Sequence, residues 1–359
     1  MERARGASVT GGDPGAGALD GAHRRDGELT EPITVLATPI LGAPLSRDLV
    51  ARIEAVEDVT CARIAADGRI HGDADESVFD DAEVLLLGGV PASVLDHVVS
   101  RAPRLRWIHS ASAGVDRIST AVVRERRLVV TNARGVFSRP IAEYVVMMSL
   151  AISRRLPQLL ELQRERTWQP LRGREMSELT IGIVGYGSIG EEVARLLAPF
   201  GCRVLATRRH PDRGAGEAGG VELLGLDDLH EVLRASDIVV VAAPLTEETA
   251  GMIGAEQLAE MREDAWLINI ARGRLIDELA LRRALESGWI GGAVLDVFSE
   301  EPLSPESPLY RTPNVIITPH TSWASDRVIE RTVDLFVDNL RRDRAGEPLR
   351  NVVDLEAGY

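Results

Sequence analysis

The sequence predicts an α/β protein with two doubly wound domains, each built on a parallel sheet. Its length of 359 residues is enough for two ordinary domains. From Ile33 onward, strand-like apolar segments alternate with helix-like segments. Residues 181–184 are an apolar run that breaks into a glycine-rich turn, and a helix-compatible segment follows at once. Alternation of this kind indicates parallel strands joined by helical crossovers.

The N-terminal half begins with a segment that carries no structural pattern. Residues 1–31 are rich in Gly, Ala, Asp and Arg without apolar periodicity, so they are predicted to form a disordered tail. The tail has no apolar segment of the kind that a secretory signal requires. Strands are then expected at residues 33–41, 59–66, 82–89, 105–112 and 127–133. Helices are expected between them at 46–56, 92–102 and 116–126.

The C-terminal half continues the alternation around the glycine-rich turn. A long helical pattern covers residues 138–162 and is interrupted near Pro157. Strands are expected at 181–184, 203–207, 237–244, 265–271, 291–298 and 315–320. Helices are expected directly after the glycine turn and at 255–264, 278–288 and 325–342.

Composition argues against several classes of function. The formal charge of −14 at pH 7 disfavours nucleic acid or an anionic membrane as a partner, and no apolar run approaches the length of a membrane span. The chain has no lysine, which excludes Schiff-base chemistry. Cys61 and Cys202 lie far apart and the histidines have no metal-ligand spacing. We therefore expect no disulfide, no metal and a reducing, cytoplasmic location.

The glycine pattern at Gly185, Gly187 and Gly190 predicts a dinucleotide site. Gly185 permits a tight turn, Gly187 lets the backbone approach a pyrophosphate, and Gly190 lets the helix pack close to the strand. The helix begins around Ser188 and Ile189, and its N-terminus offers free N–H donors and a positive dipole end to phosphates. A turn needed only for packing is the alternative, and the strand–turn–helix context favours the cofactor.

The next strand indicates which dinucleotide is bound. In an NAD site, an acidic residue about 20 residues after the glycines accepts a hydrogen bond from the ribose 2′-hydroxyl. Here Arg208 stands at that position, and Arg209 follows it. Two guanidinium groups suit a 2′-phosphate, so the sequence favours NADP over NAD. A solvated basic turn is the alternative interpretation.

Three polar residues follow apolar segments that are expected to be strands: Arg272, Glu301 and His320. Ligands of open α/β sheets bind where such strands end. An arginine can grip a carboxylate and polarise a neighbouring carbonyl. A histidine can exchange a proton with the forming alkoxide, and a carboxylate beside it orients it and favours its protonated form. Together these groups suffice for hydride transfer between a nicotinamide and a 2-oxo acid.

Each of the three residues alone also fits a structural role. Arg272 could cap a helix or join a surface ion pair, and Glu301 lies in an acidic loop that could simply be solvated. His320 could be a buried histidine with satisfied hydrogen bonds. Their joint order downstream of a dinucleotide motif favours the functional interpretation.

The chain resembles the D-isomer-specific 2-hydroxyacid dehydrogenase family from about residue 32 to its end. The matching motifs, besides the glycine turn, are SAGVD at 112–116, IAEYVV at 141–146, APLTEET at 243–249, NIARGRLIDE at 269–278, GAVLDVFSEEPL at 292–303 and TPHTS at 318–322. The SAGVD form and the arginine after the second strand resemble the glyoxylate/hydroxypyruvate reductase-like branch. The resemblance implies a Rossmann cofactor domain, residues 134–319, inserted in a flavodoxin-like substrate domain, residues 32–133 with 320–359.

The resemblance also implies roles for particular residues. Arg272, Glu301 and His320 match the catalytic Arg, Glu and His of the family, and Asp296 matches an aspartate near the nicotinamide carboxamide. Cofactor contacts are expected from Gly185, Gly187, Ser188, Ile189, Gly190, Arg208, Arg209, Ala243, Pro244, Thr249, Ile270, Arg272, Asp296, His320 and Ser322.

The substrate implied is a small 2-oxo or 2-hydroxy acid. Gly88 and Gly89 match a loop whose backbone N–H groups hold the substrate carboxylate, so these N–H groups would act beside Arg272 and His320. Family members are usually homodimers through the cofactor domain. Trp168 lies on an arm that resembles the region reaching toward the partner, and Trp323 follows the TPHTS motif. Whether either tryptophan touches substrate is left open.

A dinucleotide-sensing corepressor of the same fold is the alternative function. Such corepressors keep the three polar residues, but the net acidity and the lack of an added interaction segment beyond the tail disfavour that interpretation. Within the family, Glu301 disfavours a formate dehydrogenase, which carries Gln there. The short chain after the last helix disfavours a phosphoglycerate dehydrogenase with a regulatory domain.

Overall fold

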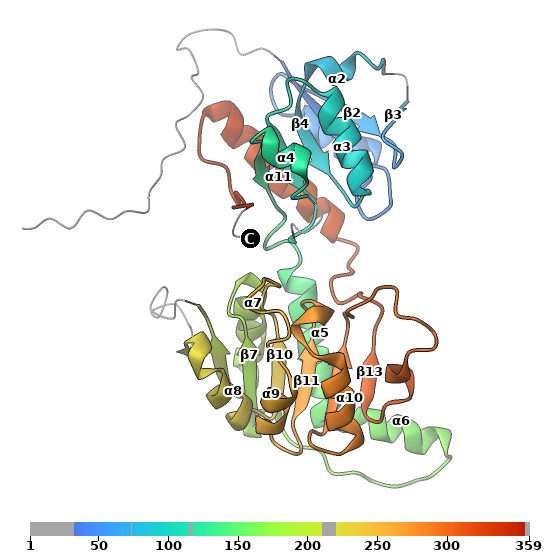
Figure 1. Cartoon of the computed structure of the whole chain (residues 1–359), viewed down its shortest axis with the longest axis vertical. Coiled ribbons are helices and arrows are strands. Elements are labelled where there is room, and N and C mark those ends of the chain that lie inside the picture. The colour runs from blue at the N-terminus through green and yellow to red at the C-terminus, as the bar shows by residue number, and fades with distance from the viewer. Residues whose placement is uncertain (1–31, 73, 115–117, 210–219, 356–359) are drawn as a thin grey trace, which may run out of the picture.

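The computed structural model describes residues 32–72, 74–114, 118–209 and 220–355. They form two lobes, each with its own central sheet (Figure 1). The predicted tail of residues 1–31 lies outside the described residues, as do Asp116 of the SAGVD motif and residues 356–359.

The first sheet has the strand order of a flavodoxin-like domain. The order is β3-β2-β1-β4-β5-β6, and all neighbours are parallel except β2 with β3. Without β3, this is the 2-1-3-4-5 order of a doubly wound sheet. The strands are β1 (Ile33–Ala37), β2 (Val59–Ile64), β3 (Ile70–His71), β4 (Ala82–Leu87), β5 (Trp107–Ser110) and β6 (Val129–Thr131). The antiparallel β3 was not predicted, because two residues carry no periodic signal.

The helices of the first lobe include one from the far end of the chain. The connecting helices are α1 (Arg47–Glu54), α2 (Val78–Asp81), α3 (Ala92–Arg101) and α4 (Ala121–Glu125). The long α11 (Val328–Ala345) packs Val333, Phe336 and Leu340 into the same core as Val35 of β1. The C-terminal segment therefore completes the first lobe, after the chain has built the second.

The second sheet has the strand order of a dinucleotide-binding domain. The order is β13-β12-β11-β10-β7-β8-β9, and all neighbours are parallel. The strands are β7 (Thr180–Val184), β8 (Arg203–Thr207), β9 (Val221–Leu224), β10 (Ile238–Val241), β11 (Trp266–Asn269), β12 (Gly292–Leu295) and β13 (Val315–Ile317). The order reverses between β7 and β10, which is where doubly wound sheets bind ligands.

The helices of the second lobe confirm the predicted interruption near Pro157. Arg155, with φ of 56°, separates α5 (Ser138–Ser153) from α6 (Leu156–Arg164), and Pro157 lies in the first turn of α6. The remaining helices are α7 (Ser188–Leu197), α8 (Leu229–Ala235), α9 (Ala255–Glu260) and α10 (Glu278–Glu286). Short 3₁₀ turns are Met176–Glu178, Ala198–Phe200, Leu226–Asp228, Gly273–Leu275 and Pro308–Arg311.

Several strands are shorter at their carboxyl ends than the sequence predicts. The predicted strand 237–244 ends at Val241, and the predicted strand 315–320 ends at Ile317. The apolar run continues through 242–244 in the first case and gives way to Thr318-Pro319-His320 in the second. In both, the backbone leaves the ladder to form the loops at this edge. These loops carry the predicted site residues.

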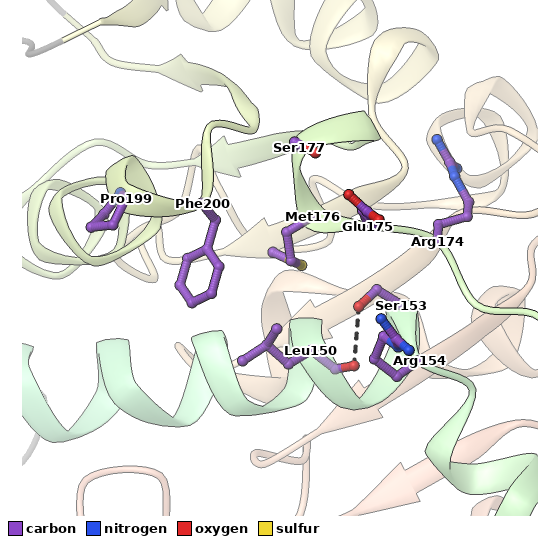
Figure 2. A pocket seen from close by; sticks show the side chains of 9 residues that line it. All are labelled: Leu150, Ser153, Arg154, Arg174, Glu175, Met176, Ser177, Pro199 and Phe200. Atoms are coloured by element: carbon purple, nitrogen blue, oxygen red, sulfur yellow. Dashed lines mark hydrogen bonds between the residues drawn. The ribbon is translucent and has the colours of Figure 1, made fainter.

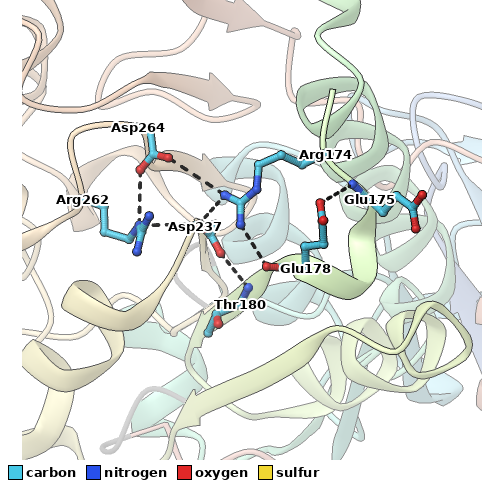
Figure 3. Close-up of polar contacts among 7 residues, drawn as sticks. All are labelled: Arg174, Glu175, Glu178, Thr180, Asp237, Arg262 and Asp264. Carbon is cyan, nitrogen blue, oxygen red and sulfur yellow. Dashed lines mark hydrogen bonds and ion pairs between the residues drawn. The ribbon is translucent and has the colours of Figure 1, made fainter. Parts of the chain in front are cut away.

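The chain is held at the amino end of β7 by a cluster of charged side chains (Figure 3). Arg174 donates to Asp237 Oδ1 at 2.6 Å, and Thr180 N–H donates to Asp237 Oδ2 at 2.8 Å. Arg262 lies 3.5 Å from the same carboxylate, and Asp264 lies beside both arginines. The Asp237 side chain is only 10% exposed. This cluster fixes where the segment after α6 enters the second sheet.

A buried histidine lies in the core of the first lobe. His109 on β5 has no exposed surface, and its Nδ1 lies 2.8 Å from Thr131 Oγ1. Its ring contacts the rings of Trp107 and Phe336, with centroids 6.4 Å and 5.4 Å away. Burial lowers the pKa of His109 from 6.5 to about 3, so it is neutral in the folded protein.

We expect His109 to make the protein sensitive to acid. In the unfolded chain His109 binds a proton as the pH falls through 6.5, whereas in the folded protein it stays neutral down to about pH 3. The free energy of unfolding therefore decreases as the pH falls over this interval. Between pH 7 and 5, this costs about 2 kcal/mol of unfolding free energy. His109→Gln, which cannot titrate, should lose about that much less stability over the same interval in urea unfolding. An equal loss of unfolding free energy in the wild type and in His109→Gln would show that His109 is not the source of the acid sensitivity.

Among the described residues, no helix combines the length and apolar character needed to cross a membrane.

Candidate active site

The glycine turn after β7 has the geometry expected of a phosphate cradle. Gly185 has φ of +101°, and a Cβ there would lie 2.5 Å from the backbone N of Ala243. A Cβ on Gly190 would lie 2.6 Å from the oxygen of Gly185, so α7 approaches the turn too closely for a side chain. Gly187 faces open space and is the residue before the first turn of α7. The open space therefore lies at the N-terminus of α7, next to the backbone N–H groups of Ser188 and the residues that follow it.

The two arginines after β8 are both near carboxylates. Arg208 continues the backbone pairing by donating its N–H to Leu224 O. Its guanidinium lies 4.0 Å from the carboxylate of Glu191, in the first turn of α7. Arg209 forms an ion pair with Glu248, which lies in the loop after β10. The sequence did not predict either contact, because both partners come from separate strand–helix units.

The loop after β10 is folded on itself by a threonine. Ala243 is buried against the glycine turn. Thr249 Oγ1 donates to Pro244 O at 2.7 Å and accepts from Thr246 N–H at 2.8 Å. Thr249 was expected to contact the cofactor, and here its hydroxyl also shapes the loop.

Arg272 lies in a tight turn after β11. The side chain of Asn269 closes this turn, since its Oδ1 accepts from Ala271 N–H at 3.1 Å and its Nδ2 donates to Arg272 O at 3.0 Å. Ile270, within the turn, is buried. A Cβ on Gly273 would overlap Phe298 C at 1.9 Å, so the chains after β11 and β12 touch directly.

Glu301 and His320 form a hydrogen-bonded pair. Glu301 Oε2 lies 2.8 Å from His320 Nδ1, and Glu301 Oε1 accepts from Phe298 N–H at 3.0 Å. A carboxylate accepts only, so Nδ1 carries the proton of this bond and Nε2 is the other ring nitrogen, available for chemistry. The two side chains are 35% and 40% exposed, so small molecules can reach them. Since β11, β12 and β13 are neighbours, the loops that carry Arg272, Glu301 and His320 share one edge of the sheet.

Asp296, at the end of β12, holds the loop that carries His320. Its carboxylate is fully buried and accepts from Thr318 Oγ1 at 2.5 Å, Thr321 N–H at 2.8 Å and Ser322 N–H at 2.9 Å. Its backbone oxygen accepts from His320 N–H at 2.8 Å. His320 has φ of 49°, which a non-glycine residue keeps only when its surroundings impose it. The sequence assigned Asp296 to the cofactor and missed this second role.

The predicted substrate loop follows β4. Gly88 N–H donates to Thr38 Oγ1 at 2.6 Å, and a Cβ on Gly88 would overlap Pro39 O at 1.8 Å. The N–H of Gly88 is therefore already used inside the protein. Gly89 faces open space. Of the two predicted glycines, Gly89 is the better placed to offer an N–H to a ligand.

The two tryptophans that the sequence left open differ in environment. The Trp168 side chain is fully exposed. Trp323 is half-buried and meets the ring of Phe137 edge-on, with centroids 6.3 Å apart.

A pocket of about 350 Å³ lies away from these residues (Figure 2). It lies where the end of α5 meets the segment before β7 and the end of α7. It is lined by Leu150, Ser153, Arg154, Arg174, Glu175, Met176, Ser177, Pro199 and Phe200. None of these residues belongs to the predicted site. Among the described residues, no cluster of three or more His, Cys, Asp or Glu side chains could hold a metal ion.

Comparison with known proteins identifies the family. Residues 146–322 match the family described as "D-isomer specific 2-hydroxyacid dehydrogenase, NAD binding domain". A glyoxylate reductase of Korarchaeum cryptofilum is 37% identical over 265 residues, which cover 72% of this chain and 79% of that protein. The chain belongs to the D-isomer-specific 2-hydroxyacid dehydrogenase family. It is therefore an oxidoreductase that acts on CH–OH donors with a nicotinamide dinucleotide.

Solved structures agree with this assignment. A D-isomer-specific 2-hydroxyacid dehydrogenase of Xanthobacter autotrophicus, in complex with NADPH and MES, is 32% identical with a TM-score of 0.79, covering 92% of this chain and all of that one. An NADPH-dependent glyoxylate/hydroxypyruvate reductase of Sinorhizobium meliloti, in complex with NADP and sulfate, is 27% identical with a TM-score of 0.76, covering 91% of this chain and all of that one. These relatives are enzymes, which supports catalysis over the corepressor alternative.

Proposed function

We propose that this dehydrogenase reduces a small 2-oxo acid, of the glyoxylate or hydroxypyruvate kind, with NADPH. The hydrogen-bonded pair of His320 and Glu301, on the same sheet edge as Arg272, carries the proposal. A nicotinamide bound at this site would supply the hydride that adds to the carbonyl carbon. The guanidinium of Arg272 binds the substrate carboxylate and polarises the carbonyl. His320 Nε2–H then gives its proton to the new alkoxide while Glu301 holds the ring in place.

The glycine turn fits the dinucleotide expected there. Gly187 leaves open space at the N-terminus of α7, and side chains on Gly185 and Gly190 would clash with the backbone. We assign the pyrophosphate to the N–H groups of this turn. Asp296 is fully buried and both its carboxylate oxygens are engaged within the protein, Oδ2 by Ser322 N–H, so it would act on the nicotinamide end of the site by holding the loop that carries His320 and Ser322.

We propose that the substrate carboxylate is held by Arg272 and by Gly89 N–H, since Gly88 N–H is bonded to Thr38. We propose that the cofactor domain comprises residues 134–319. It is inserted in the substrate domain, which comprises residues 32–133 and 320–359. The site then lies between a loop of the first lobe and the strand ends of the second.

The proposed preference for NADPH rests on Arg208 and Arg209. Charge-assisted hydrogen bonds contribute about 1.5–3 kcal/mol each. We expect the wild-type kcat/KM for glyoxylate reduction to be higher with NADPH than with NADH. Arg208→Asp should shift the ratio toward NADH by about 100-fold, because the new carboxylate repels the 2′-phosphate and accepts from a ribose hydroxyl. Steady-state kinetics with both reduced cofactors measures this.

A charge reversal at the other end of β8 is the matched control. Arg203 is exposed at the amino end of that strand, paired with Glu222 at 2.7 Å. Arg203→Asp should leave the cofactor ratio unchanged. A clear NADH preference in the wild type would contradict the proposed role of Arg208 and Arg209.

We also propose a homodimer formed through the second lobe, in the cytoplasm. The surface around α6 supports the dimer, since α6 has no buried residue and exposes Leu156, Leu159 and Leu160. Trp168, on the segment that follows, is fully exposed. Apolar side chains gathered in this way are typical of protein interfaces. The free thiols of Cys61 and Cys202 are compatible with a reducing compartment.

A further inference from the structure

The loop that carries His320 is fixed by a chain of hydrogen bonds that begins on α5. Tyr144 OH lies 2.7 Å from Thr318 Oγ1, and Thr318 Oγ1 donates to Asp296 Oδ1 at 2.5 Å. The carboxylate only accepts, so the threonine proton is used in that bond. The bond between the two hydroxyls therefore runs from Tyr144, which donates, to Thr318, which accepts.

This chain reaches the acid/base residue through a single carboxylate. Asp296 accepts from Thr318 two residues before His320 and from Thr321 and Ser322 directly after it. Its backbone oxygen accepts from His320 N–H. The left-handed φ of 49° at His320 needs such restraint from both sides. Any group that fixes Asp296 and Thr318 also fixes the direction of the imidazole.

We propose that Tyr144 and Thr318 are positioning residues that hold His320 in line with its substrate, acting through Asp296. The inference rests on the proposed role of His320 as the acid/base group. It extends that role to Tyr144 of the IAEYVV motif on α5, which lies 176 residues before His320 in the sequence.

The environment of Tyr144 suits a permanent donor. The residue is 8% exposed, in the core shared by α5 and the second sheet. Burial, and after it the nearby carboxylate of Asp296, raises the pKa of Tyr144 to about 12, so it keeps its proton at the pH of catalysis. A phenylalanine would fill the same core, and only the hydroxyl serves the hydrogen-bond chain.

The test separates positioning from stability. Tyr144→Phe and Thr318→Val each remove a hydroxyl and keep the side-chain shape. Each should lower kcat by about 10- to 100-fold, since small misplacements of a catalytic group have effects of this size. The KM for the 2-oxo acid and the Kd for NADPH should change less than about twofold. Because both hydroxyls act through the same chain of hydrogen bonds, the kcat of the double variant should be no lower than that of the more impaired single variant.

Two control variants complete the experiment. Thr318→Ser keeps the hydroxyl and should retain wild-type kcat. Ser149 is fully buried on α5 and donates to Val145 O at 2.8 Å, away from the hydrogen-bond chain. Ser149→Ala should lower the Tm without lowering kcat. The inference would be overturned if Tyr144→Phe and Thr318→Val, like Ser149→Ala, changed the Tm without lowering kcat. It would also be overturned if the loss of kcat in the double variant were the full sum of the two single losses in free energy.

The result also distinguishes this inference from the proposed function. If His320→Ala kept wild-type turnover, the acid/base role itself would fail, and the inference with it. If His320→Ala lost activity while Tyr144→Phe and Thr318→Val kept it, only the positioning role would fail. If one of the variants Tyr144→Phe and Thr318→Val does not fold, the kcat of the other still tests the positioning role.

Discussion

Arg272→Ala is expected to lower kcat/KM for 2-oxo acids by about 10³-fold while NADPH still binds. The guanidinium is assigned to both the substrate carboxylate and the carbonyl oxygen, so its loss weakens substrate binding and the transition state together. Removing one partner of a buried charged pair costs about 2–5 kcal/mol, and removing one donor to a developing oxyanion costs about 10²–10³-fold in kcat. Steady-state kinetics with glyoxylate and fluorescence titration with NADPH measure the two effects separately.

Arg274 offers a matched control two residues away. It is exposed on the 3₁₀ turn that follows Arg272, so Arg274→Ala removes the same charge from the same loop. That variant should keep kcat/KM within about twofold of the wild type. Wild-type turnover by a folded Arg272→Ala protein would remove Arg272 from the mechanism.

His320→Ala is the second change with a large expected effect. General acid–base catalysis contributes about 10²–10⁴-fold, and we expect kcat to fall within this range. Since most of the expected cofactor contacts come from residues other than His320, the Kd for NADPH should stay near the wild-type value. Rapid single-turnover measurements show whether the chemical step itself is slowed.

Two further variants test whether the loss of activity is specific to His320 and its partner Glu301. Glu301→Gln keeps a group that can hold the imidazole but removes the charge, so its kcat should lie between those of the wild type and His320→Ala. His230 is exposed on α8, and His230→Ala should behave as wild type. A His320→Ala protein with undiminished single-turnover rate would mean that the proton comes from another source.

Much of the fold could be predicted because parallel strands are buried on both faces. The predicted strand 203–207 matches β8 in full, and the glycine turn and the break near Pro157 lie as expected. Strand β9 (Val221–Leu224) was not predicted, because it is a short edge strand with little burial and so shows a weak pattern. Strand β3 was also missed, although Asp67-Gly68 before it is a turn dipeptide that could have indicated a hairpin.

The site could be predicted only where motifs lie at strand ends. The loops of Arg272, Glu301 and His320 follow neighbouring strands, and the expected contact of Glu301 with His320 is present. Contacts between distant segments carry no local signal. The bond of Gly88 to Thr38 and the anchoring of the His320 loop by Asp296 depend on which loops meet in space, so no pattern of spacing indicates them.

The most direct test of this account follows the hydride. Wild-type enzyme is mixed with hydroxypyruvate and NADPH that carries deuterium in both positions at nicotinamide C4, and the product is analysed by mass spectrometry and chiral chromatography. The account predicts D-glycerate with a single deuterium at C2, and very little of it from Arg272→Ala. Unlabelled glycerate, or no glycerate from wild-type enzyme that has bound NADPH, would contradict it.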